Sequence, residues 1–156
     1  MPNTNLLIMP NPLVSIIIPC YNYGHLISHT LDSLTKQTFK DWEALIIDDG
    51  SKDETATIIA EYMTKDSRFK YHFQSNSGVS TARNYGIRLS TGSYIQFLDA
   101  DDLLSPAKIE MQVNLLHEKK DVMVCYCNSV QFGLNANDLT NDVNLENDTL
   151  LNMRQI

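Results

Sequence analysis

Apolar runs that stop abruptly at polar residues recur along the chain. Residues 13–19, 42–47 and 92–98 are rich in β-branched and aromatic side chains, and each run ends at Pro or Asp. Their length and composition predict strands that are buried on both faces. Residues 69–74 alternate apolar with polar side chains, which predicts a strand nearer a sheet edge. The run 121–127 predicts a fifth strand.

Helical periodicity separates these runs. Apolar residues recur at spacings of three and four in four segments, 25–38, 54–64, 80–89 and 106–119. Strands that alternate with helices in this way predict an α/β fold, with a mostly parallel sheet, helices on both faces and right-handed crossovers.

Short polar residues before three of these helices predict N-caps. Asp53 or Ser51 is expected to cap the second helix, and Ser80 the third. Asp102 or Ser105 is expected to cap the fourth.

The polar residues that end the strands are expected at one edge of the sheet. In open parallel sheets, ligands bind outside the carboxyl ends of the strands. The groups that fall there are Pro19, Tyr21 and Asn22, then Asp48 and Asp49, residues 74–78, and Asp99 and Asp101. This clustering predicts a ligand site.

Asp99 and Asp101 follow the strand at 92–98 directly. In extended chain, residues two apart project to the same side, roughly 6.5 to 7 Å apart along the backbone. Such a pair suits a cation that keeps waters and binds substrate phosphates, Mg²⁺ or Mn²⁺. A purely structural role in capping the next helix is the alternative interpretation.

Three further residues have a binding interpretation, and two of them, Tyr21 and Arg83, have a structural one as well. Tyr21 offers a ring on which a nucleobase can stack, or it packs as a loop aromatic. Asp49 can accept from a base or ribose donor. Arg83, near a helix start, can reach a phosphate or form an ordinary surface ion pair.

Composition and charge narrow the ligand. The 156 residues, 43% hydrophobic, fit one compact domain. A net charge of −7 without Lys or Arg runs argues against nucleic acid as a partner. An anionic ligand would need a metal, backbone N–H groups or a few placed cations. The three cysteines, an odd number, predict reduced thiols in the cytoplasm.

Several common sites have no support in the sequence. Neither a P-loop nor a G-x-G-x-x-G fingerprint occurs, and a nucleophile elbow is absent. His25 and His29 share a helix face but lack a third metal ligand. The apolar patch 6–9 is too short to span a membrane, and residues 1–12 are expected to form a flexible leader.

Five ordered segments between about residues 13 and 128 resemble the signature of family 2 nucleotide-sugar glycosyltransferases. They are VSIIIPCYN at 14–22, QTFKDWE at 37–43, IDDGSKD at 47–53, GVSTARNYG at 78–86 and LDADD at 98–102. The resemblance implies a GT-A type, Rossmann-like fold.

The same resemblance implies roles for single residues. Asp101 matches the DXD element as the closer metal ligand, and Asp99 is nearer the ribose or the metal waters. The nucleotide-binding residues implied are Pro19, Tyr21, Asn22, Asp49, Arg83 and Asp99.

The implied activity is transfer of a hexose-like sugar from a nucleoside-diphosphate donor, with UDP favoured, to a hydroxyl of a carbohydrate or lipid-linked acceptor. Members of the family use a divalent metal and typically invert the anomeric centre with an Asp or Glu base. That base normally follows the DXD strand by a long stretch, so we expect it beyond Ile156. Residues 13–156 are then the donor-binding part, with little or no activity alone.

Two alternatives stay open. The chain can be a non-catalytic nucleotide-sugar binding or interaction module. A sugar-nucleotide pyrophosphorylase is a weaker candidate, because residues 20–24 replace its Gly-rich loop. Apolar residues near 134–151 predict self-association. The expected location is cytoplasmic, peripheral to the inner membrane face in a longer protein.

Overall fold

The computed structural model describes residues 12–127, 129 and 151–152. The chain divides into two compact units, one formed by residues up to 35 together with 40–103, the other by residues 36–39 and those from 104 onward. Most of the expected leader and the acidic and apolar tail at 130–150 lie outside the described residues.

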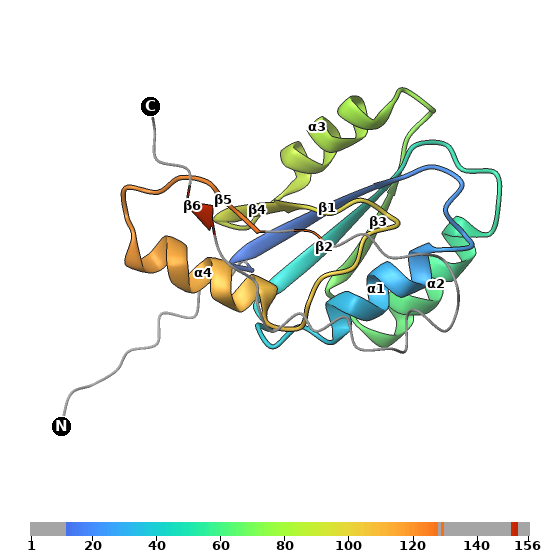
Figure 1. The fold of residues 1–156 in the computed structure, drawn as a ribbon. Helices are drawn as coiled ribbons and strands as arrows, with labels where there is room; N and C mark the ends of the chain where they lie inside the picture. Colours follow the sequence, from blue (N-terminus) through green and yellow to red (C-terminus); the bar gives the residue numbers. More distant parts are fainter. Residues whose placement is uncertain (1–11, 128, 130–150, 153–156) are drawn as a thin grey trace. The chain divides into compact units, whose positions relative to one another are not determined.

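The first unit is built on a four-stranded parallel sheet (Figure 1). Its strands are β1 (Val14–Cys20), β2 (Trp42–Asp48), β3 (Phe69–Phe73) and β4 (Tyr94–Phe97), in the spatial order β3-β2-β1-β4. Every neighbouring pair is parallel. The parallel α/β sheet expected from the sequence is confirmed.

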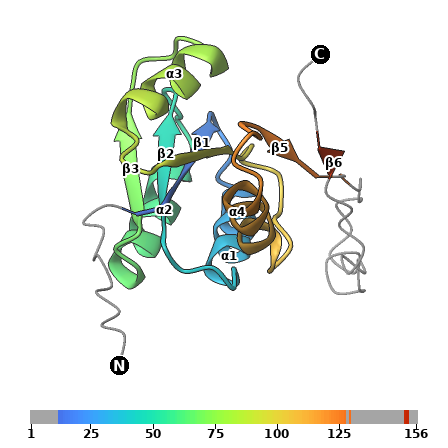
Figure 2. The ribbon, with the colours of Figure 1, turned by 90° about the vertical axis from the view of Figure 1, so that its left-hand side faces the viewer.

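Three helices connect these strands: α1 (Ile27–Thr35), α2 (Thr55–Lys65) and α3 (Val79–Leu89). Helices α1 and α2 lie on one face of the sheet and α3 lies on the other (Figures 1 and 2). Right-handed crossovers account for this arrangement, because the chain advances in one direction from β1 through β2 to β3 and returns in the other direction to β4. Helices on both faces are therefore confirmed as well.

The core lies between the central strands and the helices, because β1 and β2 are buried along their whole length. On the α3 face, Ile17 packs with Leu45, Ile47 and Ala82. Gly86 lets α3 approach β1 closely, since a Cβ there would lie 2.4 Å from Cγ2 of Ile17. This close contact fixes the position of α3 on the sheet.

Strand β4 differs from the prediction. A strand buried on both faces was expected, but its side chains alternate between half-buried and exposed, and Ile95 and Phe97 are each 43% exposed. The reason is its position, because among the described strands β4 pairs only with β1. Strand β3 lies at the opposite edge, as its alternation predicted.

A buried carboxylate joins the amino ends of the strands. Glu43 of β2 accepts from Oγ of Ser15 at 2.6 Å, Nζ of Lys70 at 2.6 Å, and both N–H (3.0 Å) and Oγ1 (2.8 Å) of Thr91. Burial alone would raise the pKa of Glu43, but these hydrogen bonds outweigh it and lower the pKa to about 2. The network ties β1, β3 and the segment before β4 to β2.

The second unit contains α4 (Lys108–Glu118) and a small antiparallel sheet of β5 (Cys125–Tyr126) with β6 (Leu151–Asn152). The fifth strand predicted at 121–127 is therefore wrong in length and partner. An apolar run indicates strand propensity but not its pairing, and Met123 is 83% exposed. In the described part of the chain, no helix is long and apolar enough to cross a membrane.

The predicted cap of α4 is also wrong. The N-cap position falls on Ala107, which makes no side-chain cap, rather than on Asp102 or Ser105. Instead Gln37 reaches the helix start: its Oε1 accepts from the N–H of Ile109 at 3.3 Å and its Nε2 donates to the Ser105 carbonyl at 2.7 Å. A residue distant in sequence replaces the local cap.

The predictions for the other two caps have different outcomes. Asp53 acts at the start of α2, where its Oδ1 accepts from the N–H of Thr55 at 3.1 Å, although the N-cap position itself is Glu54. For α3 the N-cap is Gly78, and Ser80 lies inside the helix. The prediction of Ser80 as a cap is therefore wrong.

Candidate functional site

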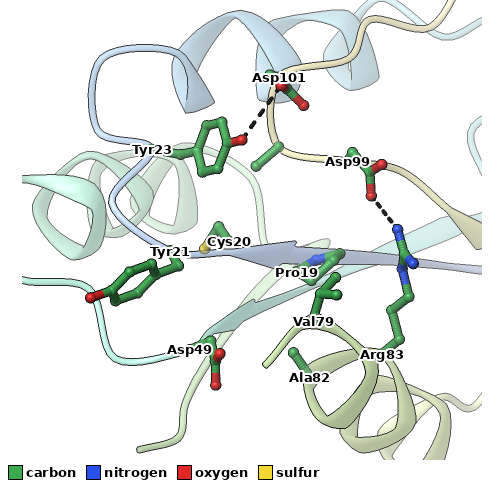
Figure 3. A pocket seen from close by; sticks show the side chains of 11 residues that line it. Pro19, Cys20, Tyr21, Tyr23, Asp49, Val79, Ala82, Arg83, Asp99 and Asp101 are labelled. Carbon is green, nitrogen blue, oxygen red and sulfur yellow. Dashed lines mark hydrogen bonds and ion pairs between the residues drawn. The ribbon is translucent and has the colours of Figure 1, made fainter. Parts of the chain in front are cut away.

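A cavity of about 410 Å³ opens in the first unit at the carboxyl ends of β1, β2 and β4, beside the start of α3 (Figure 3). Six residues that the sequence singled out line it together: Pro19, Tyr21, Asp49, Arg83, Asp99 and Asp101. The sheet edge predicted from strand ends is thus where these groups meet.

Asn22, the seventh predicted residue, is not among the residues that line the cavity. Its backbone has a positive φ of 59°, its N–H donates to Oγ of Ser51 at 2.8 Å, and its Oδ1 accepts from the N–H of Lys52 at 2.8 Å. Asn22 therefore joins the loop after β1 to the loop after β2.

Asp99 and Asp101 do not lie in a strand. Strand β4 ends at Phe97, and the N–H of Asp102 donates to the carbonyl of Asp99 at 3.1 Å, so residues 99–102 form a turn, hereafter the acidic turn. The extended-chain geometry assumed for the pair is therefore wrong. The turn still brings both carboxylates to the cavity wall.

A buried hydroxyl holds the acidic turn against α1. Oγ1 of Thr30 donates to the carbonyl of Ala100 at 2.8 Å, and both residues are almost completely buried. A buried carbonyl without a partner would cost free energy, so this bond helps to fix the turn. It restrains the residue that stands between the two predicted metal ligands.

Asp101 faces a tyrosine that the sequence interpretation missed. The hydroxyl of Tyr23 donates to Oδ2 of Asp101 over 3.5 Å (Figure 3), and the Tyr23 ring stacks almost parallel to His25 with centroids 6.1 Å apart. Burial and then the charge of Asp101 raise the pKa of Tyr23, so it stays a neutral donor.

Asp99 is paired from the other side of the cavity. Nη2 of Arg83 lies 2.6 Å from Oδ1 of Asp99, with side-chain exposures of 36% and 50% (Figure 3). The Nε–H of Arg83 is buried and has no hydrogen-bond partner among the described residues. The guanidinium therefore binds the carboxylate through one end only.

The acidic turn concentrates negative charge. Burial and then the charges of Asp101 and Asp99 raise the pKa of Asp102. Among the described residues, no three His, Cys, Asp or Glu side chains form a complete metal-binding set. Two carboxylates on the wall of the cavity nevertheless fit Mg²⁺ or Mn²⁺, which prefer oxygen ligands and keep several waters or phosphate oxygens.

Asp49 is held firmly by the loop that precedes α3. Its Oδ1 accepts from Nε2 of Gln74 at 2.7 Å and the N–H of Ser77 at 2.8 Å, and its Oδ2 accepts from the N–H of Gly78 at 2.8 Å. Burial opposes ionisation, but these bonds lower the pKa of Asp49. A carboxylate has about four acceptor positions, so about one is left for a ligand.

Besides Tyr23, the cavity is lined by Cys20, Val79, Ala82 and Ala100, which sequence reasoning did not select. Val79 and Ala82 precede Arg83 by four and one positions, and the helical spacing of Val79 and Arg83 was a usable signal. Cys20 is buried, and burial followed by the nearby acids raises the pKa of its thiol, so it stays protonated and unreactive.

Comparisons with known proteins identify the family and the fold of the chain. The Glycosyl transferase family 2 profile matches residues 15–153. An uncharacterized glycosyltransferase of Rickettsia typhi is 44% identical over 119 residues, which are 75% of this chain and 36% of that protein. The chain thus spans about a third of the length of this curated relative.

Two solved structures share the fold of the chain. One is S. aureus TarS 1-349 in complex with UDP-GlcNAc, at TM-score 0.65 and 30% identity over 67% of this chain and 31% of that one. The other is the mannosyltransferase PcManGT of Pyrobaculum calidifontis in complex with GDP-Man and Mn²⁺, at TM-score 0.64 and 26% identity over 72% and 34%. The GT-A type fold is confirmed, and the chain belongs to glycosyl transferase family 2.

Proposed function

We propose that the cavity binds the nucleoside diphosphate of a sugar donor, and that the chain supplies the donor side of a metal-dependent, inverting sugar transfer. The observation that carries this proposal is the convergence of six predicted residues, from three strand ends and α3, on one cavity. The solved complexes of TarS with UDP-GlcNAc and of PcManGT with GDP-Man support a nucleotide-sugar donor.

The base and ribose end of the donor fits the side of the cavity at Tyr21 and Asp49. Tyr21 is 43% exposed, which leaves its ring face accessible for stacking on a base. Asp49 has about one acceptor position left, and as an ionised carboxylate it can accept only from an N–H or O–H donor. Uracil carries such a donor, as do the other bases, so we propose UDP on the support of the TarS complex with UDP-GlcNAc.

The diphosphate end fits the side at Arg83, Asp99 and Asp101. Arg83 is the cation at this wall of the cavity and can bind a phosphate directly. Asp101 and Asp99 would hold the metal through oxygen ligands, with Tyr23 orienting the Asp101 carboxylate. A bound divalent cation supplies charge neutralisation for the diphosphate as it leaves the anomeric carbon.

The remaining step needs a different carboxylate. Inversion requires a base that removes the proton from the acceptor hydroxyl on the face opposite the leaving group. Asp99 and Asp101 are assigned to the leaving-group side, so neither is that base. We propose a carbohydrate or lipid-linked hydroxyl as the acceptor, used by an enzyme at the inner membrane face.

Calorimetric titration with UDP, with and without Mn²⁺, tests the proposal. We expect binding that depends on Mn²⁺ and is about 30-fold or more weaker in Asp101→Asn, while the exposed control Asp121→Asn binds as wild type does. Binding that ignores both the metal and the Asp101 substitution would overturn the proposal. Release of UDP from UDP-sugars in the presence of simple acceptors separates a catalytic chain from a module that only binds the donor.

A further inference from the structure

The ion pair between Arg83 and Asp99 uses only part of the hydrogen-bonding capacity of the guanidinium. A guanidinium can grip a carboxylate through two parallel hydrogen bonds, but here only Nη2 reaches Asp99. The buried Nε–H of Arg83 is left without an acceptor. The guanidinium carbon also lies 6.0 Å from the ring centroid of Phe97.

A diphosphate would satisfy this guanidinium better than Asp99 does. Its several oxygens can accept from more than one guanidinium N–H group at once, whereas Asp99 accepts only from Nη2. Arg83 is also the one cationic side chain among the described residues that line the cavity. Any anion that enters the cavity therefore competes with Asp99 for Arg83.

We propose that the Arg83–Asp99 ion pair is an exchange contact that is broken when the donor binds. In the free protein each side chain neutralises the other. In the bound state the diphosphate takes Arg83, and the released Asp99 carboxylate turns to the metal and its waters. This inference rests on the proposed function. It adds that Arg83 and Asp99 pair with each other before the donor binds and with the ligands afterwards.

The exchange couples the two ligands energetically. Either ligand alone must break the ion pair, because each needs one of its two members. The second ligand then meets a side chain that is already free. Metal and diphosphate therefore bind with a positive coupling that exceeds their direct attraction for one another.

The test is diphosphate binding without metal. UDP is titrated in EDTA by NMR against wild type, Asp99→Asn and the control Asp102→Asn, which removes one negative charge from the same turn but no contact with Arg83. We expect Asp99→Asn to bind metal-free UDP about threefold more tightly than Asp102→Asn does, since an exposed ion pair is worth a factor of this order.

A second pair of variants assigns the gain to Arg83. In an Arg83→Gln background, Asp99→Asn should bind metal-free UDP no more tightly than Asp102→Asn. Equal affinities of the two Asn variants in the wild-type background would overturn the proposal, as would a gain that persists without Arg83 or the absence of any metal-free binding by Asp99→Asn.

The same samples and Asp101→Asn, titrated with Mn²⁺, keep this inference separate from the proposed function. If wild type binds UDP with Mn²⁺ and Asp101→Asn binds it far more weakly, but Asp99→Asn shows no metal-free gain, the exchange is refuted and the donor site stands. If wild type fails to bind UDP with Mn²⁺, the proposed function itself fails. Thermal unfolding of each variant confirms that binding is compared between folded proteins.

Discussion

The two ends of the same sheet treat carboxylates in opposite ways. At the amino ends of the strands, Glu43 is 2% exposed and accepts four hydrogen bonds from three other segments. At the carboxyl ends, the Asp99 side chain is 50% exposed and accepts one bond from Arg83, and Asp101 accepts one long bond from Tyr23.

This difference separates structural acids from acids available to a ligand. Glu43 accepts four hydrogen bonds from the protein, about as many as a carboxylate can accept, so its charge serves the fold. The oxygens of Asp99 and Asp101 keep most of their positions open to solvent. An ionised carboxylate is tolerated at both ends for different reasons. Protein donors satisfy the buried carboxylate of Glu43, whereas Asp99 and Asp101 are exposed to water.

Asp48 and Asp49 show the same contrast between neighbours in sequence. Asp48 is 1% exposed and is held by the hydroxyl of Tyr71 at 2.7 Å and the N–H of Ser51 at 2.7 Å. Asp49 lines the cavity, yet it accepts three hydrogen bonds from the loop before α3. It therefore organises that loop and has about one acceptor position left for a ligand.

The largest effect is expected from removing the saturated acid. Glu43→Ala should lower the free energy of unfolding by about 3 to 4 kcal/mol, because the donors of Ser15 and Thr91 lose a buried charged acceptor. Urea denaturation measures the change. The exposed control Glu61→Ala should stay within about 0.5 kcal/mol of wild type. A Glu43→Ala loss under about 1 kcal/mol would show that the network adds little to the fold.

Acid should remove the same contribution without a mutation. The pKa of Glu43 is lowered from 4.5 to about 2 by folding, so its stabilisation is present above about pH 5 and is lost as the pH falls from 4.5 toward 2. The loss should reach about 3 kcal/mol. Stability curves of wild type and Glu43→Gln should converge over this interval, and parallel curves would contradict the lowered pKa.

At the other end of the sheet, substitution should affect binding rather than folding. Asp101→Asn should weaken Mn²⁺-dependent UDP affinity about 30-fold or more, or about 2 kcal/mol, because it removes a charged oxygen ligand. Its urea midpoint should stay within error of wild type, as Asp101 makes one long hydrogen bond. A large stability loss with intact binding would make Asp101 a structural acid like Glu43.

The sequence predicted the centre of this molecule better than its edges. The runs that became β1 and β2 are buried throughout, so burial and pattern agree. The run at 92–98 is similarly apolar, but whether it forms an edge strand depends on which strands pair with it. Those pairings are tertiary contacts, which the local pattern does not contain. The same limit explains the cap of α4, which comes from Gln37 across a long stretch of chain.

The sequence predicted six of the residues that line the cavity, but it did not predict their geometry. Strand ends located Pro19, Tyr21 and Asp49 at the cavity correctly. The family resemblance implied Asn22 and not Tyr23 as a binding residue, whereas in the structure a positive φ and two loop hydrogen bonds engage Asn22. Which side chain of a short loop faces inward depends on such backbone details.

The smallest expected effect has the opposite sign to that of Glu43. Burial and the charges of Asp101 and Asp99 raise the pKa of Asp102, so its ionised form is less favourable in the folded protein than in the unfolded chain. A raised carboxyl pKa means that ionisation costs stability at neutral pH, and the cost disappears once acid protonates the group. Asp102→Asn should therefore raise stability at pH 7 by a few tenths of a kcal/mol, about what exposed charge pairs contribute.

High salt provides the check on the origin of this gain. Repulsion between exposed carboxylates is screened at about 1 M NaCl, where the Debye length is about 3 Å, so the advantage of Asp102→Asn in urea denaturation should shrink there. It should also vanish at a pH low enough to protonate Asp102 in both states. If the substitution instead lowers stability at pH 7, the acidic turn is held together by its charges rather than strained by them, and the contrast between the two ends of the sheet fails.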